Sequence, residues 1–364
     1  MAIGATERLA LRKSVRDLLR DSCTEQDVRQ VMTTEAGFDR RLWQQMAGLG
    51  VTGMLVDTWY GGAGLSAVEL EAVTEETGAA LLPSPFIASG VLAATLIQQA
   101  GTPEDQQRLL PGLAGGTSIG TVAVTGKLGT WTPEGIEVEV AADGTLAGRA
   151  RYVTFGQAAD VILVIARSAD GIGVYEVAPD AAGFSRQAES VFDPTVRLSV
   201  FSFDATPARR LGAAGWEAVQ EALDLTVIAL AGEQAGGARR ILELTVDYLK
   251  TRVQFGRPIG SFQALKHLAA DLLVQVESAA SAAQHAAVQK EAGGEEADGA
   301  VALAGFACAE AYETTALYSI QMHGGIGFTW EHPAHLFLRR ARSGAQLFGS
   351  SRAHRERYLA SKGA

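Results

Sequence analysis

The period of the hydrophobic residues changes twice along this chain, and those changes constrain its fold more than any other feature. In the first third, apolar residues recur at three- and four-residue spacing, which is typical of helices. In the middle third they alternate with polar residues, as in strands, and in the last third the helical spacing returns. We therefore predict a mainly α protein with a central β domain. The predicted N-terminal helical domain, middle β domain and C-terminal helical bundle occupy residues 1–120, 121–212 and 213–364.

Short turn and capping signals refine the first and middle thirds. Asp143-Gly144 and Asp170-Gly171 each lie between alternating runs and predict hairpin turns. Two such hairpins indicate a small antiparallel β domain. In the first third, the glycine-rich stretch YGGAGLS allows tight turns, and its last residue, Ser66, is expected to cap the helix that follows.

Three long alanine-rich segments make up most of the last third. The predicted helices span about 216–253, 262–291 and 298–322, and Ser261 is the expected cap of the second helix. Alanine-rich faces let helices approach closely, so we predict that these three pack together as a bundle.

The formal net charge of −10 is spread over the whole chain of 364 residues. Without a basic stripe, binding to nucleic acid is not expected. The start of the chain lacks the apolar core of a signal peptide, and no segment reaches the roughly 20 apolar residues of a membrane span. Cys23 and Cys308 lie far apart and are expected to be unpaired thiols in a reducing compartment. We expect a cytoplasmic protein.

The first distinctive motif is TRVQFGRPIGSFQALKH, residues 251–267. It places Arg252 at the end of one predicted helix and Gln263 in the first turn of the next. A guanidinium and an amide beside a helix N-terminus can bind an anionic ligand. By spacing alone, a plain turn between two helices is the simpler interpretation.

The second motif is QMHGGIGFTWEHPAHLFLRRAR, residues 321–342. Its glycines let the backbone approach a ligand closely, but no predicted strand precedes them, so the motif is not a nucleotide-binding glycine-rich loop. We do not expect a metal site, because no helix presents two of the histidines four residues apart with a carboxylate partner. The histidines in question are His323, His332 and His335.

Two further polar groups lie near the end of the chain. The arginines of the second motif, Arg339, Arg340 and Arg342, are more simply a solvated or bundle-pairing face than an anion site. In the stretch QLFGSSRAHRE, neither Ser350 nor His354 has the partners of a nucleophilic catalytic group.

The two motifs, in this order, resemble those of the acyl-CoA dehydrogenase family of flavoproteins. The stretches YGGAGLSAVELEAVTEETG and LLPGLAGG look like its N-terminal domain, and AVTGKLGTWT and AGRARYVTFGQAAD look like altered forms of its flavin-binding β-domain motifs. The resemblance covers essentially the whole chain. It implies an N-terminal helical domain, a middle β-barrel-like domain and a C-terminal four-helix bundle, usually assembled as a tetramer.

The resemblance implies that one half of an FAD site is intact. In the family, an R-x-x-F-G turn, a glutamine beyond it and a Q-x-x-G-G segment contact an FAD bound mainly by a neighbouring subunit. Such residue types supply the cation and the closely approaching backbone donors that a pyrophosphate needs. The matching residues here are Arg252, Phe255, Gln263, Gln321, Gly324 and Gly325.

The other half of the flavin site, contributed by the β domain, is weakened. Thr125, Tyr152 and Thr154 match family positions that usually meet the flavin ring. Trp131, however, stands where the family has a serine that helps to bind pyrophosphate and thioester. Near the C-terminus, Ser351 matches a threonine that touches an FAD hydroxyl in the family.

The resemblance also implies that the usual catalytic base is missing. The family's reaction removes an α-proton from an acyl-CoA thioester as a hydride passes to the flavin, so a carboxylate is needed beside the α-carbon. The two family positions for that carboxylate are occupied here by Gly349 and Thr226. Glu233 is a poor substitute, because it lies two helical turns beyond Thr226, about 10 Å further along.

The leading interpretation is one subunit of a heteromeric FAD-dependent acyl-CoA dehydrogenase, similar to the α2β2 enzymes of actinobacteria that act on steroid side-chain CoA thioesters. A second, similar chain would supply the base, and an electron-transfer flavoprotein would accept the electrons. The alternatives are a self-sufficient homotetramer that uses Glu233, a flavin-dependent monooxygenase on the same fold, and a structural pseudo-enzyme. The sequence does not identify the acyl chain, whether of a steroid side chain or a branched acid.

Overall fold

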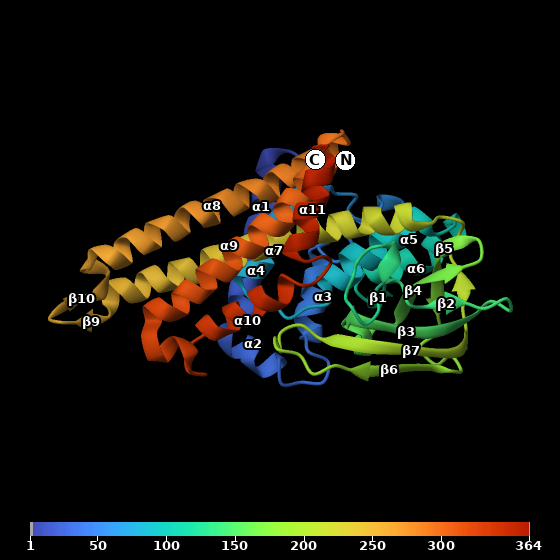
Figure 1. The fold of residues 1–364 in the computed structure, drawn as a ribbon, viewed down its shortest axis with the longest axis horizontal. Coiled ribbons are helices and arrows are strands. Elements are labelled where there is room, and N and C mark those ends of the chain that lie inside the picture. Colours follow the sequence, from blue (N-terminus) through green and yellow to red (C-terminus); the bar gives the residue numbers. More distant parts are fainter. Residues whose placement is uncertain (1–2, 364) are drawn as a thin grey trace.

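The computed structural model describes residues 3–363, and its elements follow the predicted order of helices, sheet and helices (Figure 1). The N-terminal part contains α1 (Ala5–Ser22), α2 (Glu25–Val31), α3 (Arg40–Gly48), α4 (Ala67–Ala79), α5 (Ala94–Ala100) and α6 (Pro103–Ala114), with two short turns, η1 (Thr58–Tyr60) and the π-helical η2 (Ile87–Ala93). Strand-rich residues then form the middle part. The mainly α fold with a central β domain is therefore confirmed.

The middle part is built from eight strands: β1 (Gly120–Ala123), β2 (Glu139–Val140), β3 (Thr145–Thr154), β4 (Val161–Ser168), β5 (Gly171–Val177), β6 (Phe184–Ala188), β7 (Leu198–Pro207) and β8 (Arg209–Arg210). They form one curled sheet in the order β6-β7-β3-β2-β4-β5-β8, with β1 paired to β4. Short helical turns η3 (Pro133–Gly135) and η4 (Gly156–Ala158) interrupt the connections.

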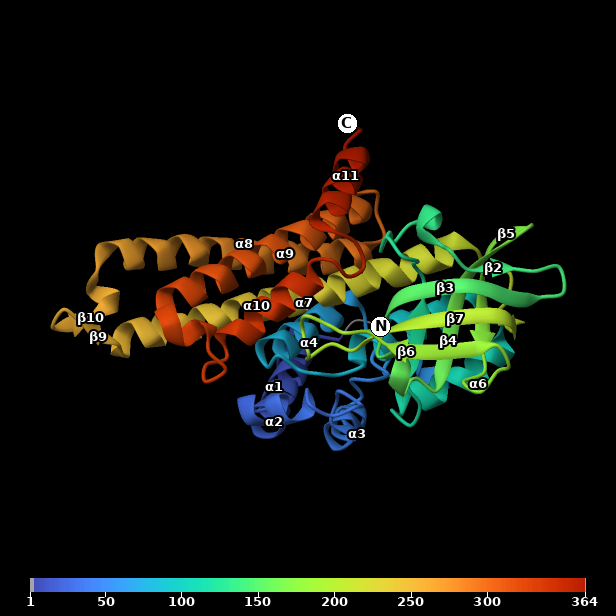
Figure 2. The ribbon, with the colours of Figure 1, turned by 60° about the horizontal axis from the view of Figure 1, so that its bottom comes forward.

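The C-terminal part is helical. It contains α7 (Trp216–Thr251), a small ribbon of β9 (Val253–Gln254) and β10 (Arg257–Pro258), η5 (Ile259–Ser261), α8 (Gln263–Ala292), α9 (Glu296–His323), η6 (Gly324–Phe328), α10 (Ala334–Gly344) and α11 (Ser351–Ser361). Figures 1 and 2 show α7, α8 and α9 running side by side, with the β9–β10 ribbon at the end far from the sheet.

Several local predictions are confirmed. The Ser66 hydroxyl accepts a hydrogen bond from the Val68 amide at the start of α4, and Glu69 accepts one from the Ser66 amide. Asp143 lies in the turn between β2 and β3, where it accepts a hydrogen bond from the Thr145 amide. Asp170 lies in the tight turn between β4 and β5, which pair from Ser168 and Gly171 onward. These turns formed as expected because each is specified by neighbouring residues.

Two local predictions are wrong. Ser261 does not cap α8; its hydroxyl donates to the Pro258 carbonyl instead, and Phe262 is the residue before the helix. The sheet is also not purely antiparallel, because β4 pairs in parallel with both β1 and β2. The chain leaves β1, forms the β2–β3 hairpin and returns as β4, so β1 and β4 run in the same direction, which a local alternation of residues cannot reveal.

Close packing between α4 and α7 fixes the position of the residues discussed below. A Cβ atom at Gly236 of α7 would overlap the Glu75 carbonyl oxygen, and one at Gly78 of α4 would overlap the carbonyl oxygen of Glu233. Glycine is therefore required at both contacts, since no larger residue lets the two backbones approach so closely. This contact presses the middle of α7 against the N-terminal helices.

Cys23 and Cys308 are both free and buried, as expected. Burial raises the pKa of the Cys23 thiol to about 12, so it stays protonated. Within residues 3–363, no helix is both long and apolar enough to cross a membrane.

Candidate functional site

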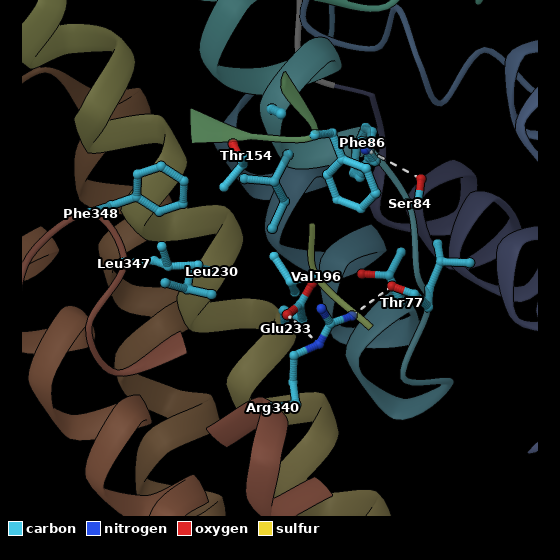
Figure 3. Close-up of a pocket in the computed structure, with 14 residues that line it drawn as sticks. Thr77, Ser84, Phe86, Thr154, Val196, Leu230, Glu233, Arg340, Leu347 and Phe348 are labelled. Atoms are coloured by element: carbon cyan, nitrogen blue, oxygen red, sulfur yellow. Dashed lines mark hydrogen bonds and ion pairs between the residues drawn. The ribbon is translucent and has the colours of Figure 1, made fainter. Parts of the chain in front are cut away.

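A small, partly open cavity lies where the N-terminal helices, the sheet and α7 meet. It has a volume of about 40 Å³, enough for one or two water molecules. Figure 3 shows Phe348 at one end near Thr154, Glu233 and Arg340 at the other end, and Leu230 and Leu347 between them. We call this space the inner cavity. Because it is so small, it holds no acyl chain in this conformation.

Phe348, which lines the apolar end of the inner cavity, packs on a second aromatic ring outside it. The rings of Trp131 and Phe348 lie 4.9 Å apart, centroid to centroid, and both residues are buried. Trp131 belongs to the loop after β1, and Phe348 to the loop between α10 and α11. This contact therefore joins the β domain to the C-terminal helices across the space where the family resemblance implied an in-chain flavin contact.

The β-domain residues expected at a flavin are close together, but two of their polar groups already have partners. The Thr125 hydroxyl donates to the Thr130 carbonyl at 2.7 Å, and the Tyr152 hydroxyl donates to the Lys127 carbonyl at 3.2 Å. Thr154 is buried and lines the inner cavity. The group thus forms a compact wall whose hydrogen bonds are largely internal.

The polar end of the inner cavity holds a buried ion cluster. Arg340 of α10 lies 3.4 Å from Glu233 and 3.9 Å from Asp193, and it donates a hydrogen bond to the Leu82 carbonyl at 2.6 Å. Burial raises the pKa of Glu233 above its usual value, although the attraction of Arg340 opposes this. Arg340 thus joins α10, α7 and the β6–β7 loop; of the three arginines, it is the one that forms a buried pairing.

The other two arginines of the motif are more exposed. Arg342 lies 3.5 Å from Glu313 on the neighbouring helix α9. Arg339 donates to the Phe192 carbonyl at 2.8 Å, and its guanidinium lies over the rings of Phe192 and Trp330. The prediction of a solvated or pairing face therefore describes these two, while Arg340 is fully enclosed.

The two positions at which the family resemblance predicts the catalytic base carry no carboxylate; Thr226 is buried and Gly349 is half-buried. Gly349 has φ of +126°, and a Cβ atom there would lie 2.7 Å from Nε2 of His354. Burial, aided by the nearby Arg357, lowers the pKa of His354 to about 4, so this ring is neutral at pH 7. Thr226 is buried in α7, where its hydroxyl donates to the Ala222 carbonyl. A side chain at position 349 would therefore point at α11, not into the inner cavity.

The serines that follow Gly349 start α11. The hydroxyl of Ser350 accepts a hydrogen bond from the Ala353 amide and so caps the helix. Ser351 is the first residue of the helix and is partly exposed. A helix cap explains the Gly-Ser-Ser sequence without any catalytic role.

A second region lies at the opposite end of α7, and we call it the bundle tip. It consists of the β9–β10 ribbon, the turn before α8, and the segment 321–333 that follows the body of α9. Arg252 is about five turns, roughly 28 Å, beyond Glu233 on α7. The bundle tip is therefore remote from the inner cavity of the same chain; in Figure 1 the β9–β10 ribbon lies at the end of α7 far from the sheet.

The remaining predicted flavin contacts all lie at the bundle tip and are exposed. Some come from the turn between the end of α7 and the start of α8, and the others from the end of α9. Phe255 is 90% exposed and has a positive φ of 53°. At Gly324 and Gly325 an added Cβ atom would meet nothing within 4 Å, so the backbone there is open to a ligand. The six residues are Arg252, Phe255, Gln263, Gln321, Gly324 and Gly325.

Two arrangements escaped the sequence analysis. One is the Trp131–Phe348 contact, which no local pattern indicates. The other is a stack of rings behind the bundle tip, in which His323 and His332 lie 4.2 Å apart. These histidines were considered only as metal ligands, and among residues 3–363 no group of three or more His, Cys, Asp or Glu side chains is placed to hold a metal. The aromatic residues on either side of Gly324 and Gly325 were the sequence feature that could have indicated this group of rings.

Comparisons with known proteins agree with this architecture. The description "Acyl-CoA dehydrogenase, N-terminal domain" matches residues 5–117, and "Acyl-CoA dehydrogenase, C-terminal domain" matches residues 213–361. The acyl-CoA dehydrogenase IpdE2 of Mycobacterium tuberculosis is 35% identical over 352 residues, which cover 95% of this chain and 94% of that protein.

Two solved structures are similar over almost the full length. A variant of the Tcur3481–Tcur3483 steroid ACAD has a TM-score of 0.89 and 31% identity, covering 98% of both chains. A chain of the ChsE4–ChsE5 complex from Mycobacterium tuberculosis has a TM-score of 0.91 and 28% identity, covering 99% of this chain and 98% of that one. The chain therefore belongs to the acyl-CoA dehydrogenase family, the FAD-dependent oxidoreductases that act on the CH–CH bond of acyl-CoA thioesters.

Proposed function

We propose that this chain is the subunit without a catalytic base in a heteromeric acyl-CoA dehydrogenase. The observation that carries the proposal is the contrast between the two regions: the predicted base positions hold no carboxylate and the inner cavity is only about 40 Å³, whereas the predicted flavin contacts are exposed at the bundle tip. A partner chain of the same family supplies the carboxylate and most of the acyl pocket. The complex then carries out α,β-dehydrogenation of an acyl-CoA thioester.

The residues of this chain fit FAD in one region and not in the other. Beside the inner cavity, Trp131 packs on the cavity-lining Phe348, and the Thr125 hydroxyl is already bonded to the Thr130 carbonyl, so these residues leave a flavin neither space nor a free hydroxyl. At the bundle tip, Arg252 offers a cation and Gly324 and Gly325 offer open backbone, which suit a pyrophosphate. FAD bound to the partner supplies the hydride acceptor, and this chain helps to hold it.

Exposed apolar side chains at the bundle tip support assembly with a partner. Phe255, Phe328 and Trp330 are all large and largely exposed. Apolar groups gathered at one end of a molecule usually mark a surface that another protein covers. In the similar structures, Tcur3481 is named together with Tcur3483, and ChsE4 with ChsE5. We therefore favour an α2β2 complex over a homotetramer.

One of these relatives suggests the substrate class, and the family resemblance suggests the electron acceptor. One similar structure is called a steroid ACAD, so we propose a steroid side-chain or related branched acyl-CoA as substrate. Electrons then pass from the reduced flavin to an electron-transfer flavoprotein. The inner cavity of this chain plays no part in choosing the acyl group, because its volume is about 40 Å³.

Separate and joint purification tests the proposal. The chain expressed alone should hold little FAD and show no dehydrogenase activity. Co-expressed with its partner, it should give a complex with one FAD for each pair of chains, measured by flavin absorbance and native mass. If the chain alone binds FAD stoichiometrically and turns over acyl-CoA, the proposal is wrong.

A matched pair of variants separates a flavin-binding subunit from a purely structural one. Arg252→Ala in the complex should raise the Kd for FAD about 10- to 100-fold, because a charge-assisted hydrogen bond contributes about 1.5–3 kcal/mol. Lys250→Ala removes a neighbouring exposed cation and should change the Kd less than about twofold. Equal FAD affinity in both variants would support the structural pseudo-enzyme.

One observation favours the self-sufficient enzyme as a second candidate. Glu233 is a buried carboxyl with a raised pKa beside a cavity, and such groups are often functional. However, Glu233 lies 3.4 Å from Arg340, and the cavity leaves no room for an acyl group next to it. We therefore rank this candidate second.

A further inference from the structure

Three rings pack against one another directly behind the bundle tip. The Tyr248 and His323 rings lie 4.5 Å apart and are inclined by 32°, and the His323 and His332 rings lie 4.2 Å apart and are inclined by 45°. Each ring comes from a different segment: Tyr248 from α7, His323 from the last residue of α9, and His332 from the loop before α10. We call this group the ring stack.

The ring stack adjoins the two segments that carry the proposed flavin contacts. The Arg252 amide donates to the Tyr248 carbonyl at 2.8 Å, so Tyr248 lies one helical turn before the arginine. On the other side, His323 directly precedes Gly324 and lies two residues after Gln321. The Tyr248 hydroxyl donates to the His323 carbonyl at 3.4 Å. The ends of α7 and α9 therefore meet through this stack.

The third ring closes the turn that contains the glycines. Nδ1 of His332 accepts a hydrogen bond from the Ala334 amide, at 3.2 Å, where α10 begins. His323 and His332 thus stand at the two ends of the segment from Gly324 to Glu331, and their stacked rings hold those ends together. The turn can present its backbone outward because its base is fixed.

The stack is built from neutral rings. Nδ1 of His323 lies 2.7 Å from the Ser319 carbonyl, so it carries the proton, and the buried Nε2 is left without a hydrogen-bond partner. His323 is only 4% exposed. Burial lowers the pKa of both His323 and His332, and the neighbouring His323 lowers that of His332 further. The unpaired Nε2 of His323 indicates that this ring serves through its contacts with the neighbouring rings and not through a hydrogen bond at Nε2.

We propose that Tyr248, His323 and His332 are positioning residues that hold the Arg252 turn and the Gly324–Gly325 turn in register, so that both contact one flavin nucleotide on the partner. The inference rests on the proposed function and extends it from the contacting residues to the group that spaces them. A dinucleotide is long and polar, and two turns bind it jointly only when their separation is fixed in advance. The ring stack provides that fixed separation.

Substitutions of His332 separate its ring from its hydrogen bond. His332→Phe keeps a flat ring but loses the acceptor for the Ala334 amide. His332→Asn keeps an acceptor at the start of α10, since asparagine is a good N-terminal cap, but loses the ring. His332→Ala loses both. His285→Asn, on the exposed face of α8, is the matched control for a histidine substitution.

The measurements are the Kd of the purified complex for FAD and the thermal midpoint of the isolated chain. If the ring positions the turns, the Kd should rise about tenfold in His332→Asn and His332→Ala and stay within about twofold of the parent in His332→Phe and His285→Asn. The thermal midpoint should depend on the acceptor for the Ala334 amide instead. It should fall in His332→Phe and His332→Ala and stay unchanged in His332→Asn. The inference is wrong if FAD affinity falls only in the variants that lose the hydrogen-bond acceptor, or if it is unchanged in all variants.

The Arg252→Ala variant shows which proposal has failed. If Arg252→Ala weakens FAD binding and the ring variants do not, the ring stack has no positioning role and the proposed function stands. If Arg252→Ala also leaves the affinity unchanged, the bundle tip does not bind flavin, and both proposals fall.

Discussion

Phe348 at the inner cavity and Phe255 at the bundle tip share an uncommon backbone conformation but have opposite surroundings. Their φ angles are +59° and +53°, in a region that costs a side-chain-bearing residue about 1–2 kcal/mol. Phe348 is 5% exposed and packs on Trp131, whereas Phe255 is 90% exposed. The first strain is offset by packing within the chain. Phe255 makes one edge-to-face contact, with Phe262 at 6.1 Å between centroids, yet stays 90% exposed, which points to a partner.

On the proposed function, packing matters as much as the missing carboxylate at Gly349. Phe348, at one end of the inner cavity, packs on Trp131, Arg340 lines the other end, and His354 lies beside Gly349. Restoring one carboxylate would therefore not restore catalysis. The bundle tip, in contrast, kept its residues exposed.

The largest difference between the regions should appear when each loses a tryptophan. Trp131→Ala should destabilise the chain by about 3–5 kcal/mol, because it leaves a cavity in a packed interior. Trp330→Ala should cost about 1 kcal/mol or less, since that side chain is 57% exposed. Urea unfolding of the isolated chain measures both. If Trp131→Ala instead lets the isolated chain bind FAD, the inner cavity is only blocked, and the contrast is weaker than we describe.

A smaller difference is expected for two glycines with positive φ. Gly349→Ala should cost about 3 kcal/mol, because it adds a clash with His354 to the backbone strain. Gly256→Ala, at the bundle tip, should cost about 1 kcal/mol, because an added Cβ atom there meets nothing within 4 Å. Thermal unfolding of the isolated chain compares them. Equal losses would mean that His354 yields easily and that the base position is not closed by packing.

The smallest expected change concerns the pH dependence of stability. The pKa of Glu233 is raised in the folded chain by burial, so folding favours the protonated carboxyl. Its contribution is fully present below the usual pKa of 4.5 and is lost as pH rises through the raised value. Glu233→Gln should therefore gain stability relative to the parent as pH rises from about 4.5 to 8.

Activity of the same variant tests the second candidate function. In the complex, Glu233→Gln should keep its dehydrogenase rate within about twofold of the parent, since the base comes from the partner. A loss of several orders of magnitude, with FAD content unchanged, would identify Glu233 as the base and make the inner cavity a working site.

The features that the sequence predicted correctly are those that depend on residues close together in the chain. The cap at Ser66 and the turns at Asp143 and Asp170 formed because each depends on a few adjacent residues. The order of helices, sheet and helices followed from the hydrophobic period for the same reason. The predicted cap at Ser261 was wrong because the Ser261 hydroxyl donates to the nearby Pro258 carbonyl instead.

The sequence could not predict contacts between distant segments. The parallel pairing of β1 with β4 depends on the hairpin between them, and the Trp131–Phe348 contact depends on how two domains dock. Family resemblance identified Trp131 and Gly349 as departures from the expected residues. The packing of Trp131 on Phe348, and of His354 beside Gly349, could be seen only in the structure.

The exposure of Phe255 also bears on the life of a chain made without its partner. An aromatic ring on a strained ribbon, with further apolar groups nearby, is the kind of surface that chaperones hold and proteases reach. Binding to a partner would bury this surface and, by mass action, lower the amount of free chain that chaperones and proteases can reach. We therefore expect the cellular level of this subunit to be set by the supply of its partner, so that balanced synthesis of the two chains matters as much as the fold of either.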